Sequence, residues 1–288
     1  MARREEEEKL VILVANLGKG STSNASDDDR LNAVSNFFAK TLRETHYDVV
    51  FAQEVSPNTQ VNDVQNLVGF SCSVRENSNS YTATFWRENV KITDHSNVWP
   101  ESVLLVPGRI QESDQRMKRF RMCKLTRGER SVLLVNFHGN TKIKENKNKK
   151  NKVNKKDKVT IFLEYLAKFQ QIKVSENCDF LVVGGDFNFD LDTFARGYQN
   201  ILDGYNLMVV PYQHQRMKAD MTGLKEKIDG LICDKELWRE SEQVVVYHYK
   251  KRGEENTARI DPKTSVIAIE DPNSEWFSFK EVWLLKFD

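Results

Sequence analysis

Short apolar segments, each bounded by polar or glycine residues, recur along the chain. Segments of this length between polar boundaries predict buried strands rather than helices. They cover residues 10–15, 49–52, 103–106, 131–137, 180–183, 228–232 and 244–247. Two longer segments, residues 29–42 and 159–169, repeat apolar side chains at the helical period and predict amphipathic helices.

The order of these elements indicates the fold class. Strands follow one another without an intervening helix across residues 81–106 and 116–137, which argues against a doubly wound parallel sheet. We therefore expect an α/β fold of packed, mostly antiparallel sheets with helices outside. Because no repeat or linker rich in proline, glycine or serine divides the chain, we expect one domain over residues 1–288, with an acidic tail at 1–8 and a Lys/Asn-rich insertion at 141–158.

Composition adds expectations about size and location. The chain has 288 residues, and 39% of them are hydrophobic, which is enough for a sizeable core. Its four cysteines are widely spaced without a C-x-x-C motif, so we expect neither a zinc site nor disulfides. No apolar segment approaches the roughly 20 residues of a membrane span, and the N-terminus lacks a signal-peptide core. We expect an intracellular protein, cytoplasmic or nuclear, without an organic cofactor.

The formal net charge of +1 hides a concentrated basic segment. Residues 142–158 contain nine lysines, against one glutamate and one aspartate. Such a segment can bind a nucleic-acid backbone, act as a nuclear localisation signal, or be a solvated insertion without a partner. The candidate nucleic-acid-binding residues within it are Lys147, Lys149, Lys150, Lys152, Lys155 and Lys156.

The segment LVVGGDFNFDLD, residues 181–192, changes from an apolar strand to a series of oxygen-bearing side chains. A calcium loop of the EF-hand type needs glycine at its sixth position and glutamate at its twelfth. Counted from Asp186, those positions hold Leu191 and Gly197. The alternative interpretation, an active site that processes phosphate esters, depends on the rest of the chain.

Similar polar residues follow other apolar segments. They are Asn16, Glu54, Asn136 and His138, which join Asp186 and Asn188 of the segment above, with Asp229 inside a further predicted strand. One such residue would be ordinary turn chemistry, but this set contains only types that bind metals or transfer protons. Hard oxygen ligands favour Mg²⁺ or Mn²⁺ over zinc.

In chain order, the segments VAN, FAQEV, VNFHGN, GGDFN and KIDGLI resemble the motifs of the endonuclease/exonuclease/phosphatase superfamily. The resemblance extends from about Asn16 to the C-terminus. It implies a four-layered α/β sandwich of two mostly antiparallel sheets flanked by helices, as in deoxyribonuclease I, with the active site at one edge. It also implies a metal-dependent phosphodiesterase, most simply a nuclease that uses Mg²⁺ or Mn²⁺.

The resemblance assigns a role to each matching residue. Glu54 matches the metal-binding carboxylate, and Asn16 matches an amide beside the metal or the phosphate. Arg116 lies near the position of a phosphate-binding arginine, with Arg119 and Arg121 as competitors. His138, in the N-x-H motif, matches the histidine that contacts the scissile phosphate.

The remaining matches concern the attacking water and the second histidine. Asp186 matches the residue that aligns or deprotonates the water, and Asn188 matches the amide that orients Asp186 and the phosphate. Asp229 matches the aspartate that orients a C-terminal histidine in an S-D-H motif. At that motif this chain has Glu270-Asp271-Pro272, so Asp271 can still bind metal, but Pro272 has no side chain that transfers a proton.

This departure leaves three functions open. The chain can be an active nuclease in which another group replaces the histidine. It can be a phosphatase that acts on a lipid or a small phosphoester. It can also be a non-catalytic member of the fold that binds nucleic acid or protein. Loss of one acid–base group costs about 10²–10⁴ in rate, which is not a total loss of activity.

Overall fold

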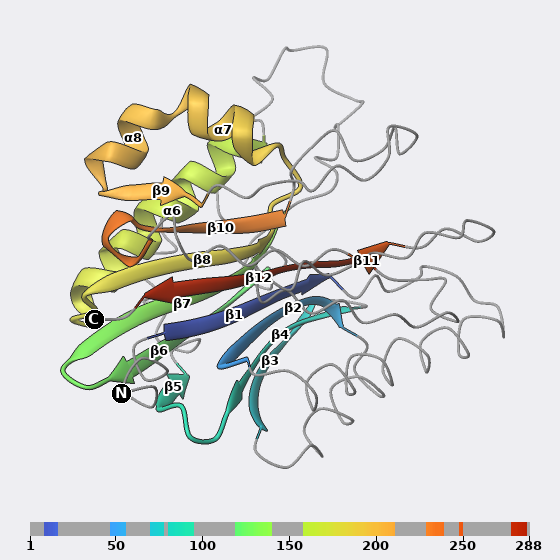
Figure 1. Cartoon of the computed structure of the whole chain (residues 1–288). Helices are drawn as coiled ribbons and strands as arrows, with labels where there is room; N and C mark the ends of the chain where they lie inside the picture. Colours follow the sequence, from blue (N-terminus) through green and yellow to red (C-terminus); the bar gives the residue numbers. More distant parts are fainter. Residues whose placement is uncertain are drawn as a thin grey trace, which may run out of the picture.

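The computed structural model describes residues 9–16, 47–55, 70–77, 80–94, 119–139, 158–210, 229–238, 248–249 and 278–286. For Asn16 and Asp229, and for strands 70–77, 248–249 and 278–286, it describes the backbone alone. These residues form two sheets of six strands each, which lie face to face (Figure 1).

The first sheet has the strand order β11-β12-β1-β2-β4-β3. Its central pair, β1 and β2, is parallel, and the other neighbouring strands are antiparallel. The strands are β1 (Lys9–Asn16), β2 (Val49–Val55), β3 (Phe70–Asn77), β4 (Ser80–Arg87), β11 (His248–Tyr249) and β12 (Ser278–Lys286).

The second sheet repeats this plan with the order β5-β6-β7-β8-β10-β9. Again only the central pair, β7 and β8, is parallel. The strands are β5 (Ile92–Asp94), β6 (Phe120–Arg127), β7 (Arg130–His138), β8 (Phe180–Asp186), β9 (Leu207–Val209) and β10 (Asp229–Asp234). Parallel neighbours end at the same edge of a sheet, so each sheet brings two strand ends together.

The hydrophobic core lies between the two sheets. Alternate residues of β7, including Val132 and Leu134, pack with Phe51 of β2 in one buried cluster, as the period-2 alternation of strands requires. The residues between them face the helices α6 (Lys158–Ser175), α7 (Leu191–Gly197) and α8 (Gln199–Gly204). These helices cover the outer face of the second sheet (Figure 1).

Most of the predicted elements are confirmed. The strand segments at 10–15, 49–52, 131–137, 180–183 and 228–232 are strands, and the helix predicted at 159–169 is the first part of α6. The predicted helix at 29–42 and the predicted strands at 103–106 and 244–247 lie outside the described residues. The sequence patterns did not predict β3, β9, β12, α7 or α8.

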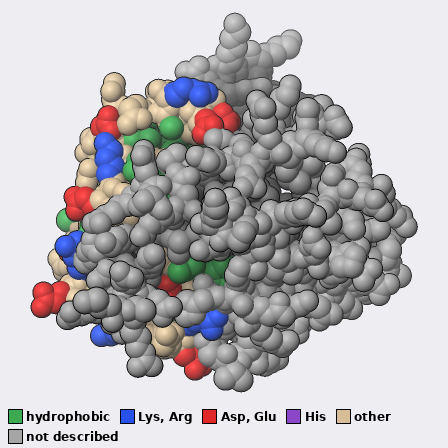
Figure 2. Space-filling view, viewed as in Figure 1, with side chains coloured by type: hydrophobic (Ala, Val, Ile, Leu, Met, Phe, Trp, Pro, Cys, Tyr) green, Lys and Arg blue, Asp and Glu red, His purple; other side chains and the backbone are tan. Residues whose placement is uncertain are grey.

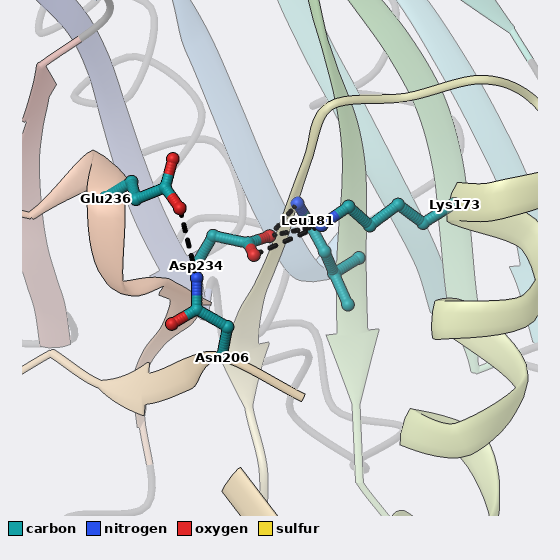
Figure 3. A network of polar contacts seen from close by, with 5 residues as sticks. All are labelled: Lys173, Leu181, Asn206, Asp234 and Glu236. Carbon is teal, nitrogen blue, oxygen red and sulfur yellow. Dashed lines mark hydrogen bonds and ion pairs between the residues drawn. The ribbon is translucent and has the colours of Figure 1, made fainter. Parts of the chain in front are cut away.

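An ion pair between the partly exposed Lys173 and the buried Asp234 ties α6 to the second sheet. Lys173 Nζ lies 3.1 Å from both carboxylate oxygens of Asp234, and the same carboxylate accepts a 2.6 Å hydrogen bond from the Leu181 N–H. Figure 3 shows these contacts, with the Asn206–Glu236 hydrogen bond nearby. Burial raises the pKa of Asp234, against the lowering effect of the Leu181 N–H and Lys173. Since Leu181 is at the start of β8, this pair lies at the opposite end of the strand from Asp186.

The described surface is mixed in charge. On the left of Figure 2, Lys and Arg side chains are interspersed with Asp and Glu. None of the described helices is long and apolar enough to cross a membrane.

Candidate active site

Two strand ends from each sheet define the candidate site. In the second sheet, His138 at the end of β7 is the register partner of Asp186 at the end of β8. Asp186 is in turn the register partner of Asp229 in β10. In the first sheet, Asn16 at the end of β1 pairs with Gln53, the residue before Glu54 in β2. The sheets therefore bring these strand ends to the same edge.

The two sheets meet at Glu54 and His138. Glu54 Oε1 lies 3.6 Å from His138 Nε2, which is close for an ion pair but too long for a hydrogen bond. The imidazole is 7% exposed, and Nε2 has no hydrogen-bond partner among the described residues. A buried polar atom without a partner is rare, and here it faces a carboxylate that is 27% exposed. This geometry suits a ligand that bonds to both groups.

The surroundings of His138 favour its neutral form. Burial lowers the pKa of His138, Asp186 raises it, and the charge of Arg119 lowers it. The net shift is downward, which favours the uncharged imidazole. A neutral imidazole can still donate one hydrogen bond, for example to a phosphoryl oxygen.

The carboxylate of Asp186 is buried and oriented by the main chain. The backbone N–H of Asn188 donates a 2.9 Å hydrogen bond to Asp186 Oδ1. The side chain of Asn188 instead donates from Nδ2 to the Gly139 carbonyl at 3.1 Å. Asn188 has a positive φ of 57°, which asparagine tolerates better than most residues. The orienting role predicted for the Asn188 amide is thus filled by its backbone.

Arg119 is the arginine that the structure places beside the site. Its Nη1 donates a 2.6 Å hydrogen bond to the Gly139 carbonyl. Burial lowers its pKa, whereas Tyr165, Asp186 and Glu54 raise it. An arginine side chain stays protonated under such shifts, so Arg119 adds a fixed positive charge beside two carboxylates. The sequence named Arg119 only as a competitor of Arg116, which lies outside the described residues.

Lys158 adds a second cationic side chain. Its Nζ donates a 2.8 Å hydrogen bond to the carbonyl of Asn188. Lys158 is the first residue of α6, at the C-terminal boundary of the Lys-rich segment. Gly139 lies just before that segment, and its backbone N–H donates to the Asp186 carbonyl at 2.6 Å. The chain therefore leaves the candidate site before the Lys-rich segment and returns to it afterwards.

Glu54 reaches the site through an irregular backbone. Val49, Phe51 and Gln53 alternate along β2, and the first two belong to the core between the sheets. Regular alternation would point Glu54 away from that core. However, Glu54 has a positive φ of 52°, and the register between β2 and β4 shifts between Ala52 and Val55. Such an irregularity re-aims a side chain, here towards His138.

Two buried amides lie behind Glu54 and His138. The sequence marked Asn136 only as a polar residue at a strand end, and it did not single out Gln53. Gln53 Nε2 donates to Asn136 Oδ1 at 2.7 Å, and both side chains are 0% exposed. Asn136 Nδ2 donates to the carbonyls of Ala52 and Ala83, at 3.2 and 2.9 Å. The available signal was the spacing: Asn136 and His138 are two residues apart and share a strand face.

The described part of the site fits a hard cation with few protein ligands. No three His, Cys, Asp or Glu side chains of the described residues converge as a metal-binding group. Mg²⁺ usually takes only one or two carboxylates and completes its shell with water and substrate phosphates. Glu54 supplies one partly exposed carboxylate beside the end of β1.

Two aspartates of the segment 181–192 have a structural role. Asp190 is the N-cap of α7, and its Oδ2 accepts a 3.0 Å hydrogen bond from the Thr193 N–H. Asp192 lies in the first turn, where a negative charge favours the helix dipole. Only Asp186 and Asn188 of this segment therefore belong to the site, and a calcium loop does not form.

Several predicted residues cannot be placed in the same detail. Arg116 and Asp271 lie outside the described residues, and only the backbone of Asn16 and Asp229 is described. The lysines proposed to bind nucleic acid also lie outside: Lys147, Lys149, Lys150, Lys152, Lys155 and Lys156.

Comparison with known proteins identifies the fold. No family model and no curated protein matches the chain. Among solved structures, an endonuclease/exonuclease/phosphatase from Bacteroides vulgatus matches with a TM-score of 0.58 and 14% identity, over 97% of this chain and 99% of that one. The endonuclease domain of TRAS1, a telomere-specific non-LTR retrotransposon, matches with a TM-score of 0.52 and 10% identity, over 97% of this chain and 98% of that one. The mannosyl-6-phosphatase Bt3783 of Bacteroides thetaiotaomicron matches with a TM-score of 0.54 and 14% identity, over 96% of this chain and 99% of that one.

These matches establish architecture. The protein has the fold of the endonuclease/exonuclease/phosphatase superfamily, as its sequence motifs predicted, and the matches cover nearly the full length of both chains. At such low identities the similarity concerns the fold alone, and one fold can carry several activities. Function has to be argued from the site.

Proposed function

We propose that the protein is a metal-dependent phosphodiesterase that hydrolyses nucleic-acid backbones. The observation that carries the proposal is the meeting of Glu54 with His138 across the two sheets, at 3.6 Å, beside Asp186. A carboxylate, a buried imidazole and a second carboxylate at one edge are the groups that phosphodiester hydrolysis needs.

Each group has a defined task in this proposal. Asp186, oriented by the Asn188 N–H, holds and polarises the attacking water. His138 donates from Nε2 to a phosphoryl oxygen, and Arg119 balances the negative charge that develops there. Bound to Glu54, with Asn16 and Asp271 as further ligands, Mg²⁺ or Mn²⁺ would neutralise phosphate charge and stabilise the leaving oxygen.

Arg116 and Asp229 keep their proposed roles. Arg116 remains a second candidate for phosphate binding, three residues before Arg119. Asp229 pairs in register with Asp186, but Pro272 stands where its histidine partner would be. We therefore expect a rate about 10²–10⁴ below that of an enzyme with the complete motif.

The basic segment supports a nucleic acid as substrate. Lys158 and Gly139, at its two boundaries, both contact Asn188. Nine lysines between residues 142 and 158 suit a long polyanion better than a small phosphoester. We propose that Lys147, Lys149, Lys150, Lys152, Lys155 and Lys156 bind the backbone.

The test is cleavage of defined substrates. Supercoiled plasmid and end-labelled single-stranded DNA and RNA are incubated with the protein in Mg²⁺ or Mn²⁺. Asp186→Asn and Glu54→Gln should abolish cleavage. Asp203→Asn is the matched control, because it makes the same chemical change in α8, where the Asp203 carboxylate accepts hydrogen bonds from the exposed side chains of Gln199 and Lys235.

The outcomes separate the candidate functions. Cleavage that survives Asp186→Asn would refute the proposed role of this site. Hydrolysis of mannose 6-phosphate or a phosphoinositide, without nucleic-acid cleavage, would show a phosphatase. No hydrolysis of any substrate, with salt-sensitive binding of nucleic acid, would show a non-catalytic binding protein.

A further inference from the structure

We propose that Gln53 and Asn136 are positioning residues for this site: their amide pair holds the break in β2 that turns Glu54 towards His138. The inference rests on the proposed function, because Glu54 is taken as the residue that binds the metal. Neither amide touches the reacting groups directly, so their effect passes through the backbone of Glu54.

The break in β2 needs support from elsewhere. Ala52 and Ala83 are register partners in the antiparallel pair β2–β4, and the register shifts directly after Ala52. At a bulge the ladder is locally disrupted, and buried backbone groups then need other partners. Asn136 Nδ2 donates to the carbonyl oxygens of both residues, although it comes from the other sheet.

Gln53 completes the link between the sheets. Its Nε2 donates to Asn136 Oδ1 at 2.7 Å and to the Phe51 carbonyl at 3.2 Å. A Cβ on Gly185 of β8 would lie 1.9 Å from the Phe137 carbonyl oxygen and 3.0 Å from Gln53 Nε2, so glycine at this position leaves room for both groups. An apolar replacement of Gln53 could make neither of these two hydrogen bonds.

The consequence for Glu54 is conformational. A non-glycine residue with a positive φ costs free energy and persists only when its surroundings hold it. The two residues before Glu54 are both held by Asn136, which donates to the carbonyl of Ala52 and accepts from the side chain of Gln53. Without the amide pair, we expect β2 to relax to regular geometry, which points Glu54 away from His138.

The experiment compares two near-isosteric variants, Gln53→Met and Asn136→Leu, with Ser131→Ala as a control. Ser131 lies in β7, like Asn136, but at the end of the strand away from His138, and its Oγ bonds to Asn177 and Asp179. Loss of this hydroxyl therefore perturbs β7 without touching the site. Direct Mn²⁺ titration, followed by electron paramagnetic resonance of the free ion, needs no turnover. We expect affinity to fall about 10–100-fold in the two amide variants, as for other residues that orient a metal ligand, and to be unchanged in Ser131→Ala.

A crystal structure of Gln53→Met provides the second readout. We expect a negative φ at Glu54 and a Glu54–His138 distance well above 3.6 Å. A folded variant with the wild-type φ and the wild-type Mn²⁺ affinity would overturn the inference. If wild-type protein binds no Mn²⁺ and cleaves nothing, the proposed function fails, whereas the backbone of Glu54 in the variant still decides the positioning role. If Asn136→Leu does not fold, Gln53→Met alone decides it.

Discussion

Gly139→Ala should damage the candidate site through the backbone. Gly139 follows β7, and its carbonyl accepts hydrogen bonds from Arg119 and from the side chain of Asn188. Its N–H donates to the carbonyl of Asp186. One residue without a Cβ therefore joins three of the groups that we place in or beside the site.

The size of the effect follows from the available space. A Cβ on Gly139 would lie 2.0 Å from the carbonyl oxygen of Phe187 and 2.5 Å from its carbonyl carbon. Real Cβ atoms stay beyond about 3.0 Å, so the backbone between Asp186 and Asn188 must move by about 1 Å. Misplacement of that size costs about 10²-fold in rate. Overpacking a filled site costs about 1–3 kcal/mol of unfolding free energy.

Two measurements test this prediction. The first is kcat/KM on the nucleic acid that the wild-type protein cleaves, and the second is Tm in thermal unfolding. The matched control is Gly197→Ala at the end of α7, where a Cβ meets nothing within 4 Å. There we expect unchanged activity and equal or slightly higher stability, since alanine favours a helix over glycine. Wild-type activity and Tm in Gly139→Ala would refute the geometry of the Gly139–Phe187 contact.

Three further predictions concern pH, ion pairing and salt. Burial lowers the pKa of His138 in the folded protein below its value of about 6.5 in the unfolded chain. The stability that neutral His138 contributes is therefore fully present above the unfolded pKa, and it is lost as pH falls through the lower folded pKa. The Tm of wild type should thus fall more than that of His138→Gln between about pH 7 and pH 5. Lys173→Met should cost about 3–5 kcal/mol at neutral pH in chemical denaturation, because it leaves the Asp234 carboxylate buried without its cation. Since burial already raises the pKa of Asp234, protonation should reduce that loss as pH falls towards about 4. Deletion of residues 147–156 should weaken nucleic-acid binding and flatten the slope of log affinity against log salt concentration. An equally steep slope in the deletion variant would count against the role of these lysines in backbone binding.

The sequence predicted the parts of the fold that depend on local pattern. Strands buried on both faces, such as β7 and β8, appear as continuous apolar segments, and their polar ends mark where they stop. His138 and Asp186 could be identified for this reason, and the structure makes them register partners. Strands with mixed patterns, such as β12 with the sequence SFKEVWLLK, gave no such signal.

The sequence could not separate residues of the same type at neighbouring positions. Asp190 and Asp192 resemble ligands as much as Asp186 does, and only the start of α7 shows that they belong to a helix. Spacing to His138 could not separate Arg116, Arg119 and Arg121. The hairpin register places Arg119 beside His138, because the His138 N–H donates to the Arg119 carbonyl, whereas Arg116 lies outside the described residues.

The orientation of Glu54 shows most clearly what a linear pattern omits. Alternation along β2 places Gln53 towards the other sheet, so Glu54 should point away from it. The structure reverses this for Glu54 through a positive φ, which the chain tolerates because residues 83 positions apart, Gln53 and Asn136, share a hydrogen bond. The sequence around Glu54 cannot predict that contact, because Asn136 lies in β7. The motif identifies Glu54 as the carboxylate of the candidate site, whereas the packing of one sheet on the other determines whether this side chain can reach the site.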